Sequence, residues 1–475
     1  MLLRYFYDKE LAQASYLVGC QETGEAIVVD PSRDIEPYLD EAEAEGLRIV
    51  AATETHIHAD FLSGARELAE RTGARLYLSD EGDENWKYRY LDGYDHELLR
   101  DGDSFKIGNI LFEVMHTPGH TPEHISLLLT DTVGAEEPMG IFTGDFVFVG
   151  DVGRPDLLEQ AVGIAATAEP GAHEMFHSLQ RFKALPDYLQ VWPGHGAGSA
   201  CGKALGAIPS STVGYEKRFN WAMQEDDEDA FVRTLLSGQP EPPRYFAMMK
   251  RLNKEGPRVL HGQPLPEHLP FSRLPTLLEE GAVVVDTRSA SAFAASHIPG
   301  TINIPVDSSF ATWAGWILDY ETPYYLLVEP HLLEAAISAL YSIGLDNVAG
   351  YFEASTVDAW LESGQPLQSY EVVSPSQVAE PILNGEMTVL DVRNLTEWEG
   401  GHLPGAKHIM LGYLPDRVEE VPTDRPVVVH CLTGARSAIG ASILQATGVP
   451  HVLNLMGGFR EWAAAGLPVV GNGSG

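Results

Sequence analysis

Histidines and carboxylates gather in four short clusters near the beginning of the chain. Imidazole and carboxylate groups are ligands that suit zinc, iron or manganese. A lone histidine is more often structural than a ligand, but four clusters in this order indicate one shared site. We therefore interpret the first half of the chain as a metal-binding unit. The clusters are His56, His58 and Asp60; His116, His120, Glu123 and His124; Asp145; and His195.

The first cluster reads as the metal motif His-x-His-x-Asp-His with its last histidine replaced by Phe61. A phenyl ring cannot coordinate a metal. The substitution therefore limits how many metals the site can hold, and so which chemistry it can perform. Two histidines and one carboxylate on one face leave three coordination positions open, an arrangement that lets Fe(II) hold substrate and dioxygen together.

A second reactive group is Cys431, far from the histidine clusters in the sequence. An apolar strand is predicted over 427–430, and a helix is predicted to begin near Ser437. The loop between them would aim backbone N–H groups and a helix N-terminus at the sulfur, and both stabilise a thiolate or a persulfide anion. Arg436 adds positive charge. The other loop residues are Leu432, Thr433, Gly434 and Ala435.

Short apolar runs precede the metal-type residues and are predicted to be buried strands. Because loops at strand ends carry chemistry on a rigid sheet, these runs would hold the candidate ligands in place. A helix is expected from Gly64 to Arg71, and residues 213–256 are charged and helical in character. The predicted strands are 26–30, 48–52, 110–114 and 139–143.

An internal repeat follows a proline-rich linker at 257–270. Two pairs of matching segments stand 105 residues apart. So long a period indicates two copies of one domain, each with strands and helices alternating around a parallel sheet. The matching pairs are 284–288 with 389–393, and 297–300 with 402–405.

The middle copy lacks the reactive cysteine. Its strand equivalent to 427–430 is predicted over 324–328 and is followed by Glu329. No cysteine occurs between Cys201 and Cys431, so this copy cannot form a cysteine persulfide. We interpret it as a structural or docking module. The predicted domains of this α/β multidomain chain are 1–256, 257–370 and 371–475.

Composition excludes several other classes of protein. Of the 475 residues, 44% are hydrophobic and 21% are charged, as in soluble globular proteins. A net charge of −37 would repel nucleic acid and anionic membranes. Three cysteines, odd in number and far apart, argue against a disulfide framework and favour a reducing cytoplasm. We find neither a signal-peptide pattern nor an apolar run of about 18 residues, so we expect no membrane span.

The histidine clusters, in this order, resemble those of the metallo-β-lactamase superfamily over residues 1–255. The resemblance implies an αβ/βα sandwich. In this superfamily, hydrolases of the glyoxalase II type hold two metals, and Phe61 replaces a ligand of the second. The mononuclear branch is the persulfide dioxygenases, whose pattern implies that His56, His120 and Asp145 are the ligands of one Fe(II). Such a site also accepts zinc or another abundant divalent metal, in crystals for example.

The same resemblance suggests supporting residues. His58, Asp60 and His195 would hold the ligands and solvent by hydrogen bonds. In the alternative interpretation, His58 is a fourth ligand to zinc.

Two further residues near the predicted metal have more than one interpretation. Arg154 lies in a stretch similar to the Gly-Arg-x-Asp segment of persulfide dioxygenases, and it would shape the substrate side of the iron site or form an ion pair with Asp156. Cys201 would be a small buried thiol, or it would take up or position a sulfane sulfur.

The segment 374–470 resembles a rhodanese domain. Related phosphatases use Cys-x5-Arg, a loop one residue longer that fits phosphate, so the shorter Cys-x4-Arg loop favours sulfur. Cys431 would then carry the sulfane sulfur, with Arg436 beside it. The resemblance rests on this loop together with 391–393, 397–398 and 401–405.

The whole chain is similar to bacterial fusions of a persulfide dioxygenase with one silent and one active rhodanese copy. That resemblance implies oxidation of low-molecular-weight thiol persulfides by O2 to sulfite and thiol, coupled to formation or use of thiosulfate at Cys431 in sulfide detoxification. Two alternatives stay open: a glyoxalase II-like zinc thioester hydrolase with a sulfur-relay rhodanese, and a non-enzymatic sulfur-relay scaffold. The sequence does not fix the carrier thiol, the direction of sulfur flow or the oligomeric state, so a homo-oligomer stays open too.

Overall fold

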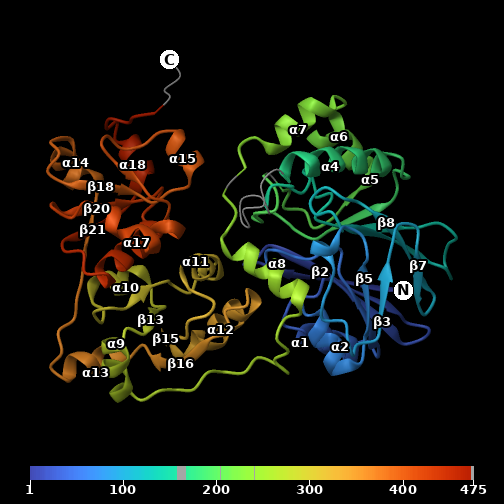
Figure 1. The fold of residues 1–475 in the computed structure, drawn as a ribbon, viewed down its shortest axis with the longest axis horizontal. Helices are drawn as coiled ribbons and strands as arrows, with labels where there is room; N and C mark the ends of the chain where they lie inside the picture. Colours follow the sequence, from blue (N-terminus) through green and yellow to red (C-terminus); the bar gives the residue numbers. More distant parts are fainter. Residues whose placement is uncertain (158–166, 204, 240, 472–475) are drawn as a thin grey trace. The chain divides into compact units, whose positions relative to one another are not determined.

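The computed structural model describes residues 1–157, 167–203, 205–239 and 241–471. These residues fall into two compact units (Figure 1). The first unit is Met1–Pro264 together with Tyr341–Gly344, and the second is Leu265–Leu340 together with Leu345–Gly475. The second unit contains both copies of the repeat, so the proposed division near residue 370 stays a prediction.

Two mixed sheets form the centre of the first unit. Their strand orders are β1-β2-β3-β4-β5-β6 and β12-β11-β10-β9-β8-β7. The strands are β1 (Leu2–Asp8), β2 (Gln13–Cys20), β3 (Glu25–Val29), β4 (Arg48–Thr53), β5 (Arg75–Ser79), β6 (His96–Leu99), β7 (Ser104–Ile107), β8 (Ile110–His116), β9 (Ile125–Asp131), β10 (Gly140–Gly144), β11 (Gln190–Pro193) and β12 (Ser211–Thr212). The helices are α1 (Glu36–Ala44), α2 (Ala65–Thr72), α4 (Ala168–Lys183), α5 (Val213–Phe219), α6 (Trp221–Gln224), α7 (Glu228–Leu236) and α8 (Tyr245–Glu255).

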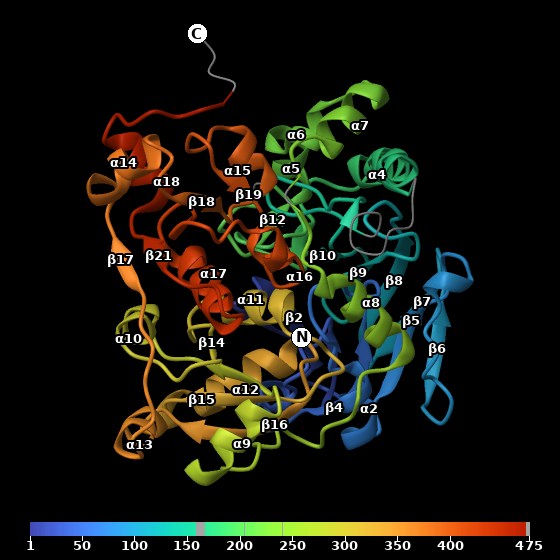
Figure 2. The same cartoon turned by 60° about the vertical axis from the view of Figure 1, so that its left-hand side comes forward.

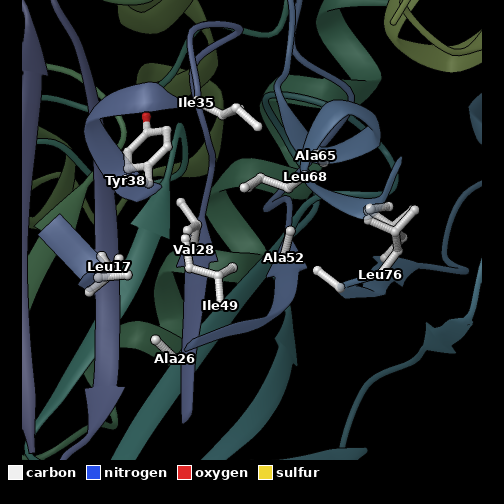
Figure 3. Close-up of a cluster of buried hydrophobic side chains, with 14 of the residues drawn as sticks. Leu17, Ala26, Val28, Ile35, Tyr38, Ile49, Ala52, Ala65, Leu68 and Leu76 are labelled. Atoms are coloured by element: carbon white, nitrogen blue, oxygen red, sulfur yellow. The ribbon is translucent and has the colours of Figure 1, made fainter. Parts of the chain in front are cut away.

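Strand β3 shows how the sequence builds the layers of this unit. Successive side chains of a strand point to opposite faces of a sheet. Ala26 and Val28 accordingly pack against helices α1 and α2, in the cluster drawn in Figure 3. Ile27 and Val29 pack on the other face, against the second sheet.

A third apolar cluster lies on the outer face of the second sheet. It joins Ile141 of β10 to Met175 and Leu179 of α4 and Phe231 of α7. Helices therefore cover both outer faces of two stacked sheets. This αβ/βα sandwich confirms the predicted fold of the first unit.

Two fully parallel sheets organise the second unit. Their strand orders are β14-β13-β15-β16 and β17-β21-β20-β18-β19. Parallel strands buried on both faces are nearly continuous apolar runs, as in the Val-Val-Val start of β13 and of β20. The strands are β13 (Val283–Asp286), β14 (Ile302–Asn303), β15 (Tyr324–Val328), β16 (Val348–Glu353), β17 (Glu371–Val373), β18 (Thr388–Asp391), β19 (Lys407–His408), β20 (Val427–His430) and β21 (Val452–Leu455).

Helices alternate with these strands, which confirms the predicted α/β architecture of both copies. Helix α17 of the second copy packs beside α10 and β14 of the first (Figure 2). One contact is a hydrogen bond of 2.9 Å from the backbone N–H of Asn303 to Oγ of Ser442. The helices are α9 (Leu274–Glu279), α10 (Ala290–Ala295), α11 (Phe310–Ile317), α12 (Leu333–Ser342), α13 (Thr356–Glu362), α14 (Pro375–Leu383), α15 (Leu395–Glu399), α16 (Leu414–Arg417), α17 (Ala435–Ala446) and α18 (Gly458–Ala464).

In the described part of the chain, no helix is both long enough and apolar enough to cross a membrane.

Candidate functional site

Three candidate ligands converge at strand ends of the first unit. His56 follows β4, His120 follows β8, and Asp145 follows β10. Their ligand atoms all lie within 4.8 Å of one another. Nε2 of His120 is 3.5 Å from Oδ2 of Asp145, and Nε2 of His56 is 4.0 Å from the same oxygen. All three side chains are buried.

The hydrogen bonds of this group leave the ligand atoms available. Nδ1 of His56 lies 3.0 Å from Oγ1 of Thr55, and Nδ1 of His120 lies 2.9 Å from the carbonyl oxygen of Arg154. Among the described residues, Nε2 of His56 and both carboxylate oxygens of Asp145 have no hydrogen-bond partner. Leaving buried polar groups unsatisfied is costly, and a cation between them would remove that cost.

The protonation of both rings also fits a metal. Burial lowers the pKa of His56 well below its usual value. Burial also lowers the pKa of His120, although the carboxylate of Asp145 opposes that effect. A neutral imidazole is the form that binds a metal. The three residues therefore fit a divalent metal ion.

A second group lies on the other side of Asp145. It consists of Asp60, His195 and Cys201, whose ligand atoms also lie within 4.8 Å of one another. Nε2 of His195 is 3.1 Å from Oδ2 of Asp60 and 3.4 Å from Oδ1 of Asp145. Asp145 thus directs one oxygen toward His56 and His120 and the other toward His195.

The carboxylates of this second group control two pKa values. Burial alone would lower the pKa of His195, but Asp145 and Asp60 raise it well above its usual value. Burial, reinforced by the same two carboxylates, raises the pKa of Cys201 to about 12. In the metal-free protein, Cys201 is therefore a neutral thiol beside a charged imidazole.

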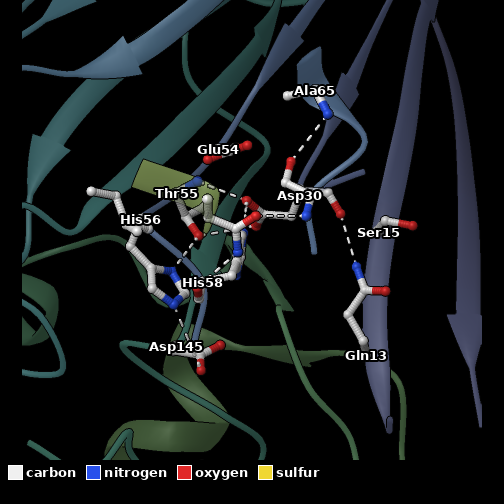
Figure 4. A network of polar contacts seen from close by, with 12 residues as sticks. Gln13, Ser15, Asp30, Glu54, Thr55, His56, His58, Ala65 and Asp145 are labelled. Carbon is white, nitrogen blue, oxygen red and sulfur yellow. Dashed lines mark hydrogen bonds and ion pairs between the residues drawn. The ribbon is translucent and has the colours of Figure 1, made fainter. Parts of the chain in front are cut away.

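The two ring nitrogens of His58 have different surroundings, because its Nδ1 has no hydrogen-bond partner among the described residues. Its Nε2 lies 3.0 Å from Oδ1 of Asp30, in the polar network of Figure 4. Burial opposes a charge on His58, but Asp30 outweighs it and raises the pKa of His58 to about 9. The ring of Phe61 packs on the ring of His58, with centroids 4.3 Å apart. This geometry gives His58 a supporting contact and leaves its role as a ligand a prediction.

The sulfur atom of Cys431 lies in a tight loop between β20 and α17. The backbone N–H of Gly434 donates to Sγ at 3.1 Å, while Oγ of Ser437 lies 3.7 Å from Sγ and donates its proton to Oδ1 of Asn454 at 2.6 Å. Gly434 has a φ of 106°, a left-handed conformation that favours glycine and lets the loop turn directly into the helix. The helix begins at Ala435, two residues earlier than predicted.

Arg436 is held on the same side of the loop by an ion pair. Its two Nη atoms donate to the carboxylate of Glu397 at 2.6 and 2.8 Å. Burial lowers the pKa of Arg436, but its hydrogen bonds to Glu397 and its contact with Cys431 raise it overall. The guanidinium therefore stays charged beside the thiol, as the sequence predicted. The remaining loop residues, Leu432 and Thr433, continue the turn around the sulfur.

Comparison with known proteins identifies both units. The sequence matches the metallo-beta-lactamase superfamily over residues 8–195, and the rhodanese-like domain over 272–331 and 374–465. A solved structure of a metallo-beta-lactamase from Staphylococcus aureus subsp. aureus COL is 46% identical, with a TM-score of 0.67. That match covers 74% of this chain and 99% of the other.

Curated relatives place the first unit more narrowly. The mitochondrial persulfide dioxygenase ETHE1 of Homo sapiens is 30% identical over 198 residues, which cover 41% of this chain and 68% of that protein. The chain belongs to the metallo-β-lactamase superfamily, fused to rhodanese-like domains. Its relatives include persulfide dioxygenases, which confirms the predicted family.

Hydrolases are also among the relatives of this metallo-β-lactamase–rhodanese fusion. A hydroxyacylglutathione hydrolase of Rhodospirillum rubrum is 34% identical over 180 residues, which cover 38% of this chain and 60% of that protein. The match to two other curated relatives spans about half of their length, 53% in each case. Identity at this level establishes the family and leaves the activity to be proposed.

The register of the two rhodanese-like sheets identifies the counterpart of the reactive cysteine. Asp286 pairs with Leu327 in one sheet, and Asp391 pairs with His430 in the other. The next residue after each pair is therefore equivalent, so Val328 occupies the position of Cys431. By the same count, Leu333 replaces Arg436. The middle copy of the fusion has lost both the nucleophile and its cation.

Arg154 forms the ion pair that one interpretation of the sequence predicted. Its Nε and Nη2 donate to the two oxygens of Asp156 at 2.8 and 2.6 Å. The contact with the candidate metal site is made by its backbone instead, because its carbonyl oxygen orients His120. Its backbone N–H donates to the carbonyl oxygen of Cys201 at 3.1 Å. Its role on the substrate side stays a prediction.

Sequence reasoning missed Asp30, which organises the first histidine loop of the fusion. One oxygen of Asp30 accepts from the backbone N–H of Thr55 at 2.7 Å and contacts His58. The other accepts from Oγ1 of Thr55 at 3.0 Å. Its φ of 50° is unusual for a residue other than glycine. The sequence did contain a signal for Asp30, because this residue stands at the end of a predicted strand, and the candidate ligands are also found near the ends of predicted strands.

Asn253 was missed as well, and no local signal marks it. It lies on helix α8 and donates through Nδ2 to the carbonyl oxygens of His58 and Phe61, at 2.8 and 2.7 Å. Its Oδ1 accepts from the backbone N–H of Ser63 at 2.9 Å. One side chain thus ties three points of the histidine loop to a distant helix.

Proposed function

We propose that this protein oxidises low-molecular-weight thiol persulfides with O2, giving sulfite and the thiol, and that Cys431 transfers sulfane sulfur. The balanced first reaction is RSSH + O2 + H2O → RSH + SO3²⁻ + 2 H⁺. The observation that carries the proposal is the buried group His56, His120 and Asp145, with Phe61 at the motif position of a second-metal ligand. Its 30% identity to a persulfide dioxygenase supports this choice.

A single Fe(II), held by His56, His120 and Asp145, would supply the dioxygen chemistry that side chains lack. The protein fixes the ligand geometry. Thr55 and the carbonyl of Arg154 set the orientation of the two rings, so that each Nε2 faces Asp145.

His195 would stabilise negative charge on the substrate. Its Nδ1 faces the carbonyl oxygen of Ala12 at 3.0 Å, and its Nε2 faces two carboxylates. Both nitrogens therefore hold protons. A proton on Nε2 would stabilise the terminal sulfur of a persulfide, which is anionic when deprotonated.

The second step would be sulfur transfer at Cys431. The thiolate attacks the outer sulfur of thiosulfate and displaces sulfite: Cys–S⁻ + S2O3²⁻ → Cys–S–S⁻ + SO3²⁻. The reverse direction forms thiosulfate from sulfite. The N–H of Gly434 and the charge of Arg436 would stabilise the sulfur anion in either direction. Low-molecular-weight persulfides, O2, sulfite and thiosulfate would be the partners, and the cytoplasm the setting.

One observation favours a second candidate, a two-metal thioester hydrolase. Asp60, His195 and Cys201 form a second convergent donor group that shares Asp145 with the first. Cys201 would then supply the ligand lost at Phe61, and the relatives include a hydroxyacylglutathione hydrolase. This candidate predicts two metals per chain and thioester cleavage without oxygen uptake.

Oxygen uptake separates the two candidates. The full-length protein would be loaded with Fe(II) under anaerobic conditions and mixed with glutathione persulfide or coenzyme A persulfide in an oxygen electrode. We expect uptake with sulfite production in equal amounts. Absence of uptake, together with hydrolysis of S-lactoylglutathione, would replace the proposed function by the hydrolase.

A further inference from the structure

A cavity of about 500 Å³ lies within the second unit, between the middle rhodanese-like copy and helix α17 of the active copy. This volume falls in the range of small-molecule sites, roughly 300–1,000 Å³. Both copies contribute walls. The lining includes Arg288, Ala292, Trp313, Glu329, Arg436 and Ile439.

This cavity occupies the place of the middle copy's own lost active site. In the active copy, Glu397 and Arg436 form an ion pair beside the reactive loop. The repeat has a period of 105 residues, so Ala292 in the middle copy stands where the active copy has Glu397. Counted onward from the last register pair, Leu333 stands where the active copy has Arg436, and its neighbour Leu332 lines the cavity. Ala292 is much smaller than Glu397 and lines the cavity, so this replacement leaves space at that wall.

Arg436 connects the cavity to the reactive sulfur. It lines the cavity together with Ala435 and Ile439, and it also contacts the thiol of Cys431. A molecule in the cavity is therefore one side chain away from the loop that would carry the sulfane sulfur.

The walls carry charges of both signs. Arg288 is held by Asp286 through Nε and Nη2, while its Nη1 has no partner among the residues that the structure describes. Arg436 is the second cation. Two carboxylates line the cavity, the half-buried Glu329 and the exposed Asp307, and Trp313 adds an aromatic surface. Carboxylates of a ligand would pair with the guanidinium groups, and an ammonium group would pair with Glu329.

We propose that this cavity binds the carrier thiol, and that the carrier is a small zwitterionic thiol of the amino-acid or peptide type. A carrier rich in phosphates fits less well, because Glu329 would repel it. The inference rests on the proposed sulfur transfer at Cys431 and assigns the middle copy the task of substrate recognition. The transfer is Cys431–S–S⁻ + RS⁻ → Cys431–S⁻ + RSS⁻. One S–S bond breaks and one forms, with no external oxidant.

Filling the cavity tests the proposal. Ala292→Phe would place a ring in the cavity, while Ala295→Phe adds the same ring on the exposed face of the same helix α10. Sulfur transfer from thiosulfate would be measured in the full-length protein with glutathione as the zwitterionic acceptor and with cyanide as a small acceptor. We expect Ala292→Phe to raise the KM for glutathione by about tenfold or more and to leave cyanide kinetics unchanged. Ala295→Phe should match the wild type with both acceptors.

Two outcomes would overturn the proposal. One is an unchanged KM for glutathione in Ala292→Phe. The other is an equal loss of sulfur-transfer activity with glutathione and with cyanide, which would indicate damage to the loop that holds Cys431. A second variant, Glu329→Gln, should raise the KM for glutathione. It should leave the KM for 3-mercaptopropionate unchanged, because this thiol lacks the ammonium group. Equal effects on the two thiols would exclude recognition of a zwitterion.

Binding without turnover separates this proposal from the proposed function. S-methylglutathione would be titrated by calorimetry into the full-length Cys431→Ser protein. We expect binding that Ala292→Phe removes and Ala295→Phe preserves. If such binding occurs but the wild type transfers no sulfur, the cavity assignment stands and the proposed reaction fails. If Ala292→Phe binds as well as Ala295→Phe, the cavity assignment fails.

Discussion

The ring of Phe61 lies 4.3 Å from the ring of His58, measured between centroids, and both side chains are buried. His58 in turn places Nε2 3.0 Å from Oδ1 of Asp30. Phe61 therefore places a phenyl ring, which cannot bind a metal, at the position where the His-x-His-x-Asp-His motif has a metal-binding histidine. This contact underlies the account of a one-metal site.

Restoring the missing ligand should change the metal count. We expect Phe61→His to raise the metal bound at saturation from one toward two per chain and to lower persulfide oxidation, because a second metal would compete for Asp145. Metal would be counted by mass spectrometry after dialysis. Phe61→Leu is the control and should bind one metal. An unchanged count in Phe61→His would mean that Phe61 does not limit the site.

Asn253 should support metal binding from a distance. Asn253→Ala removes the donors to His58 and Phe61 and the acceptor for Ser63. Removing outer hydrogen bonds around a metal site typically weakens metal binding about 10–100-fold. We expect a loss in that range in a competition with a chelator, along with about 1–3 kcal/mol lower stability. Glu255→Ala, on the exposed end of the same helix, should change neither.

The sequence identified the strand-end residues because their positions follow from a local rule. His56, His120 and Asp145 each follow an apolar strand, β4 in one sheet and β8 and β10 in the other, and the stacking of the two sheets brings these strand ends together. Asn253 follows no such rule, since its contacts depend on where helix α8 packs. The same reasoning explains why Val328 could be matched to Cys431 only by strand register. The cavity beside Ala292 is lined by residues of both copies, which no single motif records.

Glu123 should make stability depend on pH. Burial raises the pKa of this carboxyl from 4.5 to about 7, although the N–H of Ile57 and the charge of Lys250 oppose the shift. The folded chain thus holds the proton more tightly than the unfolded chain. Stability from this group is highest below pH 4.5 and falls as the pH rises toward 7.

Glu123→Gln keeps an oxygen for the N–H of Ile57 and removes the titration. We expect the variant to gain stability relative to the wild type as the pH increases from about 4.5 to 7, and to keep a constant difference above that range. Urea unfolding at a series of pH values measures this difference. A difference that does not change with pH would show that Glu123 is not protonated in the folded chain.

Cys431 should be required for sulfur transfer and not for persulfide oxidation. Cys431→Ser removes the sulfur nucleophile, and the first unit contains no contact that depends on this side chain among those described. We expect the variant to lose thiosulfate formation and to keep sulfite production from persulfide. Both products would be separated by ion chromatography. Persistence of thiosulfate formation in the variant would place sulfur transfer elsewhere, with Cys201 as the next cysteine to test.

The most direct test of the central claim is a titration of metal-free protein with Fe(II), in which oxygen uptake with glutathione persulfide is measured at each addition. The account predicts that uptake rises in proportion to iron and reaches a plateau at one equivalent per chain. A plateau at two equivalents, or no uptake at any loading, would contradict a one-iron persulfide dioxygenase.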